Sequence, residues 1–201
     1  MKQFAADAGA LLDELGAAPA HVVGLSMGGM IAFQLAVDSP RHVRTLTIVN
    51  SGPALVPHTF GEHLAILIRR VVSRLLGPGQ MGKMLAPKLF PKPEQEALRQ
   101  SFRERMAANE KAAYVATVEA IIGWSVLDRI GGITAPTLIV AADQDYTPVT
   151  AKETYARQMP NARVVVVPDA RHALPVEAPE KFNPILAEHL ARFANAQPSP
   201  S

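Results

Sequence analysis

Gly24-Leu25-Ser26-Met27-Gly28 is the stretch that decides the fold of this 201-residue chain. It stands between an apolar run, Ala20 to Leu25, which predicts a short buried strand, and an apolar-periodic run, which predicts a helix over Met27 to Asp38. A serine with glycines two residues before and two residues after it, between a strand and a helix, is typical of a sharp strand-to-helix turn.

The expected turn has a mechanical consequence for Ser26. It is so tight that the serine takes a strained backbone conformation, and a Cβ at Gly24 or Gly28 would collide with the neighbouring strand or helix. The serine hydroxyl is then exposed at the edge of the sheet, and the backbone N–H of Met27 points to the same place from a helix N-terminus. Such an N–H can hold a developing oxyanion.

Strands and helices alternate towards both ends of the chain, which predicts βαβ units and a mainly parallel sheet. The expected strands are Ala20–Leu25, Val43–Asn50, Pro136–Ala142 and Ala162–Val167. The expected helices beside them are Lys2–Leu15, Met27–Asp38, Thr150–Gln158 and a last one that ends near Ala194. We expect a capping box of Thr150 and Glu153 in the third helix, and Asn183 as the N-cap of the last one, before Pro184.

No strand is predicted between Pro53 and Ile133, where the apolar periodicity is helical throughout. The expected helices are Glu62–Leu76, ended by Gly77-Pro78-Gly79, then Met81–Leu89, Pro93–Ala107 and Lys111–Ile122. The chain is therefore predicted to divide into an α/β core, residues 1–52 and 134–196, an all-helical cap insertion, residues 53–133, and a disordered tail, residues 197–201.

Three side chains that can act together each follow a predicted strand: Ser26 the first, Asp145 the third and His172 the fourth. Because ligands bind at the carboxyl ends of the strands in an open parallel sheet, we expect these three to meet. A serine hydroxyl needs an imidazole to take its proton, and the imidazole needs a carboxylate to fix its tautomer. Asp143 remains an alternative for the acid, whereas the second strand ends in Asn50 and offers none.

The composition excludes several classes of protein. The chain has no cysteine, so disulfides, thiolate metal sites and a cysteine nucleophile are absent, which fits a reducing compartment. No apolar run is long enough to span a membrane, and the N-terminus lacks a signal-peptide core, so we predict a cytoplasmic protein. The net charge of +2 is too small to indicate a nucleic-acid partner. No helix offers paired His, Asp or Glu at ligand spacing, so no metal site is expected.

The chain resembles α/β-hydrolase-fold serine hydrolases with a helical cap, of the esterase and lactonase type. The motifs that carry this resemblance are GLSMGG at Gly24–Gly29, PTLIVAADQDYTP at Pro136–Pro148, DARHALPVEAPEKF at Asp169–Phe182, and AIIGWSVLDRI before the third strand. The resemblance covers nearly the whole chain, and its combined motifs are specific for the fold and the triad, not for a substrate. The resemblance implies Ser26 as nucleophile, Asp145 as acid, His172 as base and the Met27 N–H as one oxyanion donor.

The resemblance also implies a cofactor-independent enzyme that cleaves a carboxylic ester or lactone through an acyl-enzyme. The helical insertion is expected to form a lid over the triad, and its apolar and aromatic side chains predict an apolar pocket wall. We therefore expect a small-molecule ester or lactone with a hydrophobic part. The side chains named as substrate-binding candidates are Leu25, Met84, Trp124 and Tyr146.

One departure from these hydrolases concerns the N-terminus. The resemblance implies about four more strands before the nucleophile strand, and a loop that supplies the second oxyanion N–H, which is not present in this chain. Ala20–Leu25 would then be an exposed sheet edge. We expect Met1 to be an internal methionine of a longer protein; the alternative is a shortened protein that covers this edge by forming a homodimer.

Two further functions stay open. The chain could be a catalytically impaired or non-catalytic hydrolase fragment that acts as a binding or dimerisation module. Alternatively, the same triad could transfer the acyl group to an acceptor other than water, or carry out perhydrolysis. Dehalogenation is disfavoured, because that reaction requires a carboxylate nucleophile where Ser26 stands.

Overall fold

The computed structural model describes residues 1–57 and 59–194, which divide into two compact units. The first unit comprises residues 1–54 and the described residues from Ser125 onward, and the second comprises residues 55–124. The predicted disordered tail, residues 197–201, lies outside the described residues.

The first unit is built on a four-stranded parallel sheet in the order β1-β2-β3-β4. The strands are β1 (Ala20–Leu25), β2 (Val43–Val49), β3 (Thr137–Ala142) and β4 (Ala162–Val167). These bounds agree with the predicted strands to within one residue at each end, and the parallel pairing confirms the predicted α/β fold class. β1 lies at one edge of the sheet, as expected; the homodimer through this edge stays a prediction.

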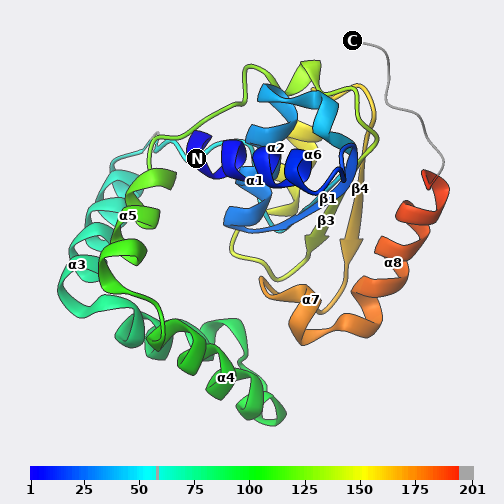
Figure 1. Cartoon of the computed structure of the whole chain (residues 1–201). Coiled ribbons are helices and arrows are strands. Elements are labelled where there is room, and N and C mark those ends of the chain that lie inside the picture. Colours follow the sequence, from blue (N-terminus) through cyan, green and yellow to red (C-terminus); the bar gives the residue numbers. More distant parts are fainter. Residues whose placement is uncertain (58, 195–201) are drawn as a thin grey trace. The chain divides into compact units, whose positions relative to one another are not determined.

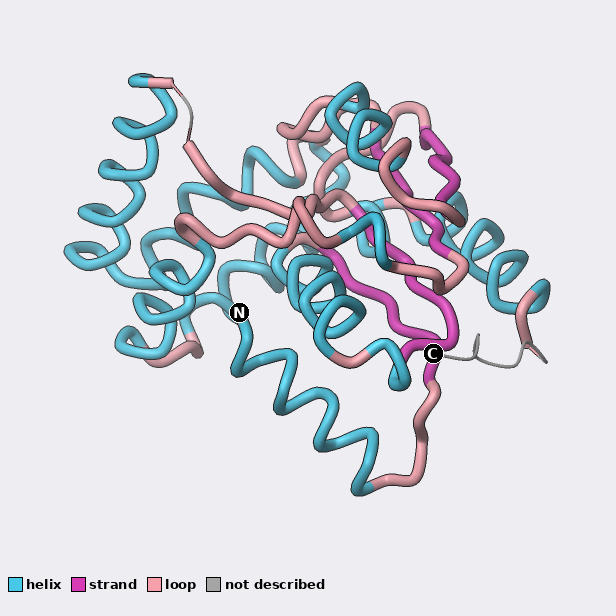
Figure 2. The backbone as a smooth tube through the Cα atoms, turned by 90° about the horizontal axis from the view of Figure 1, so that it is seen from above, coloured by secondary structure: helices cyan, strands magenta, loops and turns pink. Residues whose placement is uncertain are grey.

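Helices flank both faces of this sheet, as Figures 1 and 2 show. α1, α2 and α6 lie on one side of the sheet, and α8 lies on the other with the short α7 at its start. Their bounds are α1 (Lys2–Glu14), α2 (Met27–Asp38), α6 (Val149–Ala156), α7 (Leu174–Glu177) and α8 (Pro179–Arg192). Two short 3₁₀ helices, Pro40–His42 and Ile130–Gly132, complete the unit.

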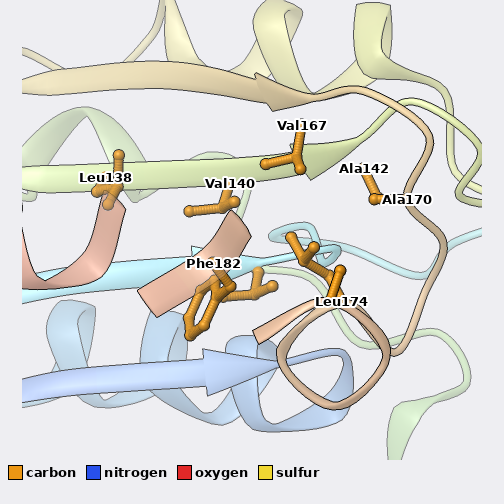
Figure 3. Close-up of a cluster of buried hydrophobic side chains, with 9 residues drawn as sticks. Leu138, Val140, Ala142, Val167, Ala170, Leu174 and Phe182 are labelled. Carbon is orange, nitrogen blue, oxygen red and sulfur yellow. The ribbon is translucent and has the colours of Figure 1, made fainter. Parts of the chain in front are cut away.

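One buried apolar cluster of the first unit lies where β3 and β4 meet α7 and α8. Leu138, Val140 and Ala142 alternate along β3 with residues that point to the other face, as side chains on a strand must. They pack against Leu174 of α7 and Phe182 of α8, which are 0% and 4% exposed (Figure 3). The loop after β4, which carries His172, is thereby held between the sheet and these helices.

Three predictions about this unit are wrong. α6 begins at Val149 with Pro148 as its N-cap, so Thr150 lies inside the helix and makes no capping box with Glu153. α8 starts at Pro179, whose fixed φ suits the first turn, and continues through Pro184, so Asn183 is not a cap. Residues 125–133, predicted to belong to the insertion, lie in the first unit, where Arg129 donates hydrogen bonds to Asp38 and to the carbonyl of Val37.

The second unit is helical, with α3 (Phe60–Leu89), α4 (Glu96–Ala107), α5 (Lys111–Ile121) and the 3₁₀ turn Pro93–Gln95. Gly77, at φ 72° and ψ 177°, interrupts α3 at the predicted Gly-Pro-Gly break. Arg70 and Arg74 both form ion pairs with Glu119, and so join α3 to α5. Its position as a lid stays a prediction. No helix within residues 1–57 and 59–194 is long and apolar enough to cross a membrane.

Candidate active site

The carboxyl ends of the four strands carry the residues singled out in the sequence. Leu25 at the end of β1 is in register with Val49 at the end of β2, and Ala142 at the end of β3 is in register with Val167 at the end of β4. Ser26 follows β1, Asp145 follows β3 and His172 follows β4. The parallel sheet therefore brings these three residues to one end of the sheet, where all four strands have their carboxyl ends.

Ser26 occupies the strained turn that the sequence predicts. Its φ of 54° and ψ of −120° are rare for a residue with a side chain. Neighbouring groups hold this conformation: the Ser26 N–H donates to the carbonyl of Val49 at 3.0 Å, and the Ser26 carbonyl accepts from the Ser51 hydroxyl at 2.6 Å and from the N–H of Gly29 at 2.9 Å. Met27 is the first residue of α2, so its N–H belongs to the unpaired first turn of a helix.

Two glycines of the turn are required for steric reasons, but they are not the predicted pair. A Cβ at Gly24 would lie 2.3 Å from the backbone oxygen of Gly28, and a Cβ at Gly29 would lie 2.6 Å from the Cβ of Ser51. A Cβ at Gly28 would meet nothing within 4 Å. The prediction that Gly28 avoids a collision is therefore wrong, because a Cβ on Gly28 would point into open space.

Asp145 and His172 lie in direct contact. The Nδ1 atom of His172 is 2.8 Å from Oδ1 of Asp145, and the Asp145 side chain is 0% exposed. The same oxygen accepts the backbone N–H of Tyr146 at 2.9 Å, and the other carboxylate oxygen accepts from the Thr147 hydroxyl. A carboxylate with this many donors is rigidly oriented, and so is the imidazole that it contacts.

The contacts of Asp145 also determine its charge. Burial by itself raises the pKa of this carboxyl, but hydrogen bonds from His172, Lys152 and Thr147 outweigh burial and bring the pKa from 3.8 to about 2. Asp145 is therefore ionised at neutral pH. An ionised carboxylate only accepts hydrogen bonds, so in the neutral imidazole of His172 the proton is on Nδ1 and the lone pair is on Nε2.

Lys152 is a residue of this site that the sequence did not reveal. Its ammonium lies 2.8 Å from Oδ2 of Asp145, and it donates to the backbone oxygen and the hydroxyl of Thr147, both at 2.7 Å. The Lys152 side chain is 1% exposed. A buried lysine in a helix is unusual, and its position seven residues after an acid is a weak signal, so only the folded loop reveals the pair.

Asn50 is a second residue of this site that the sequence interpretation missed. The sequence interpretation noted only that the second strand ends without an acid. Its Nδ2 donates to the backbone oxygens of Arg171 at 2.9 Å and His172 at 3.0 Å, and its Oδ1 accepts the N–H of Ala142 at 2.8 Å. The side chain at the end of β2 thus ties the end of β3 to the loop that carries the histidine.

Asp143, the alternative acid, has a different position. Its Oδ1 accepts the backbone N–H of Ala170 at 3.2 Å, and its own N–H donates to the carbonyl of Val167. It therefore supports the start of the loop after β4. Asp145, not Asp143, is the carboxylate in contact with His172.

The remaining ring nitrogen of His172 contacts a tyrosine. Nε2 lies 2.5 Å from the hydroxyl oxygen of Tyr146, and the two ring centroids are 4.1 Å apart with 31° between the ring planes. Within the described residues 1–57 and 59–194, no hydrogen bond joins the Ser26 hydroxyl to His172. The structure thus joins acid and histidine directly, and places Ser26 at the end of a strand in the same sheet.

The four substrate-binding candidates fall in both units. Leu25 packs against the apolar cluster of β3, β4, α7 and α8, and Tyr146 lies against His172. Met84 and Trp124 belong to the second unit, where Met84 is 45% exposed. That all four contact substrate stays a prediction.

Comparison with known proteins identifies the family of this chain. A model of the alpha/beta hydrolase family matches residues 3–185. This chain belongs to the alpha/beta hydrolase family. As a member of that family, it is a hydrolase enzyme.

Two similar proteins are both named "Putative carbamate hydrolase RutD". One, from Stutzerimonas stutzeri (strain A1501), is 29% identical over 191 residues, which are 90% of this chain and 69% of the relative. The other, from Caulobacter vibrioides (strain NA1000 / CB15N), is 30% identical over 192 residues, which are 90% of this chain and 68% of the relative.

Solved structures share the fold. The enol-lactonase from Burkholderia xenovorans LB400 superposes with a TM-score of 0.85 at 23% identity, covering 94% of this chain and 72% of that one. A thermophilic esterase from Thermogutta terrifontis superposes with a TM-score of 0.80 at 26% identity, covering 94% and 71%. Because its identity is only 23%, the similarity to the enol-lactonase shows the alpha/beta hydrolase fold alone.

Proposed function

We propose that this hydrolase cleaves a carboxylic ester or lactone with Ser26 as nucleophile, His172 as base and Asp145 as the acid that orients the base. The observation that carries the proposal is the 2.8 Å contact between buried Asp145 and Nδ1 of His172, at the sheet edge where Ser26 stands in its strained turn. A half-buried serine on such a turn, at the same end of the sheet as an oriented imidazole, is an arrangement for acyl transfer.

In the first half of the proposed reaction, the Ser26 hydroxyl oxygen attacks the substrate carbonyl carbon while Nε2 of His172 takes the hydroxyl proton. The carbonyl oxygen becomes an oxyanion, and the Met27 N–H at the start of α2 donates to it. When the intermediate collapses, the alcohol oxygen leaves with the proton from Nε2, and Ser26 holds the acyl group. Asp145, ionised throughout, stabilises the imidazolium that forms in between.

In the second half, His172 takes a proton from water, and the resulting hydroxide attacks the acyl carbon. The carboxylic acid leaves, and Ser26 regains its proton from Nε2. With an acceptor other than water, the same steps transfer the acyl group, so acyl transfer and perhydrolysis remain alternatives on the same residues.

A carbamate is a second substrate class, supported by relatives named as carbamate hydrolases. A carbamate carries the same carbonyl carbon as an ester, with nitrogen on one side of it, so Ser26 would attack it in the same way. The apolar residues of the helical unit favour the ester or lactone, provided that this unit covers the site as the sequence predicts.

The test is labelling of the purified 201-residue chain with a fluorophosphonate probe, followed by mass spectrometry to locate the adduct, and turnover of a short-chain ester, a lactone and a carbamate. We expect an adduct on Ser26 and turnover of at least one substrate. Ser26→Ala should lose both, by a factor of about 10⁶ in kcat where all the chemistry passes through the serine.

Ser101→Ala, on an exposed position of α4, is the matched control and should label and turn over as the wild type does. Full turnover by Ser26→Ala would refute the mechanism. A folded wild-type chain that neither labels nor turns over any substrate would support the non-catalytic binding module instead.

A further inference from the structure

Among the described residues, Tyr146 is the one whose side chain forms a hydrogen bond with Nε2 of His172. It lies between Asp145 and Thr147, in the loop after β3, and its backbone N–H is held by the Asp145 carboxylate at 2.9 Å. The side chain, unlike this backbone, is not held in the interior, since Tyr146 is 69% exposed. The loop is therefore anchored at its backbone, while the phenol ring stands at the surface.

The direction of the Tyr146 hydrogen bond follows from the charges beside it. Nδ1 of His172 faces a carboxylate that accepts hydrogen bonds and donates none, so in the neutral imidazole Nδ1 carries the ring proton and Nε2 carries the lone pair. The Tyr146 hydroxyl must then donate to Nε2 across the 2.5 Å that separates them. A neutral imidazole has one acceptor nitrogen, and in this structure the tyrosine occupies it.

Ser26 needs that same lone pair if it acts as the nucleophile, because Nε2 is the atom that takes the serine proton. One lone pair accepts one well-aligned hydrogen bond, and no hydrogen bond joins Ser26 to His172 in the part of the chain that the structure describes. The two hydroxyls therefore compete for one atom.

We propose that Tyr146 is a further functional residue of this site, whose hydroxyl occupies the base in the resting enzyme and must leave Nε2 before Ser26 can react. This inference rests on the proposed function, since it takes Ser26 as the nucleophile. The exposed ring can turn about its side-chain bonds without disturbing the backbone bond to Asp145. A substrate that enters displaces the ring, and part of its binding free energy is used in that displacement.

The experiment compares the second-order rate of Ser26 labelling by a fluorophosphonate probe in the wild type and in Tyr146→Phe. Phenylalanine keeps the ring and its stacking on His172 but cannot donate to Nε2. Before Ser26 can react, the wild type must break the hydrogen bond from Tyr146 to Nε2, whereas the variant has no such bond. We therefore expect Tyr146→Phe to label roughly fivefold faster. Tyr146→Ala, which also removes the stacked ring, should label at least as fast.

Tyr114→Phe, in α5 of the second unit, removes a tyrosine hydroxyl elsewhere and should leave the labelling rate unchanged. Circular dichroism would check that each variant is folded. A labelling rate of folded Tyr146→Phe that equals the wild-type rate would overturn the inference. A slower rate would also overturn it, because it would show that the hydroxyl assists the reaction. If Ser26 labels in the wild type, the proposed function stands whatever the ratio; if it labels in no variant, both fail.

Discussion

The turn that carries Ser26 and the loops that carry Asp145 and His172 are held in place by different kinds of interaction. The turn is held mainly by backbone: a positive φ at Ser26, and a Gly24 so close to the next helix that no Cβ fits. The loops are held by side chains, since Asp145 accepts from Lys152 and His172, each 2.8 Å away. Backbone sterics support one half of the candidate site, and buried charge supports the other.

This contrast determines which substitutions and which changes of pH each half of the candidate site tolerates. A steric requirement acts at single positions and is insensitive to pH, because it involves no titrating group. A network of buried charges depends on every partner and on the protonation of the carboxylate, because each unpaired member costs its full desolvation. The three predictions that follow test this contrast, starting with the largest effect.

Gly24→Ala should have the largest effect. Its Cβ would lie 2.3 Å from the carbonyl oxygen and 2.4 Å from the carbonyl carbon of Gly28, and these backbone atoms can move only with α2. We expect a loss of at least about 3 kcal/mol in the free energy of unfolding, and loss of Ser26 labelling. Urea unfolding measures the first and the fluorophosphonate probe the second.

Gly28→Ala is the matched control, because nothing lies within 4 Å of its Cβ and alanine favours a helix over glycine. It should unfold within about 0.5 kcal/mol of the wild type. Equal destabilisation by the two alanines would contradict the steric account of the turn.

Lys152→Met tests the half that depends on buried charge. It removes three hydrogen bonds and leaves the Asp145 carboxylate buried without its cation. We expect a loss of about 3 kcal/mol in the free energy of unfolding, since an uncompensated buried charge is costly. Lys88→Met, at an exposed position, should change it little.

A double variant sharpens this test. When Asp145→Asn is combined with Lys152→Met, no buried charge is left alone, so the double variant should be more stable than the sum of the two single losses predicts. Simple additivity would mean that the two residues do not act as a pair.

The smallest of the three effects is the pH dependence of stability. The folded pKa of Asp145, about 2, lies below the ordinary value of 3.8, so the unfolded state binds the proton more readily. The stabilisation is therefore complete above about pH 4 and is lost as the pH falls through 2, amounting to about 2 kcal/mol. Urea unfolding between pH 5 and pH 2 measures it, and Asp145→Asn should show a correspondingly smaller decline over the same range.

Much of the core fold could be predicted because the four strands are apolar runs bounded by turn residues, and such runs are local. Helix ends were less predictable. Pro184 was expected to start a helix and lies inside α8, because an earlier proline, Pro179, already starts that helix. Thr150 was expected to cap α6, but the preceding Pro148 takes the cap position. Both errors come from local signals that compete over a few residues.

The sequence by itself determined the strand-turn-helix around Ser26 and which strands are followed by an acid and a histidine, because sterics and apolar periodicity act between near neighbours. Only the tertiary structure decided that Asp145 rather than Asp143 contacts His172, that Lys152 is buried beside it, and that Tyr146 occupies Nε2. The physical reason is that hydrogen bonds and desolvation depend on distances of a few ångströms between loops that follow different strands, and the packing of the sheet sets those distances.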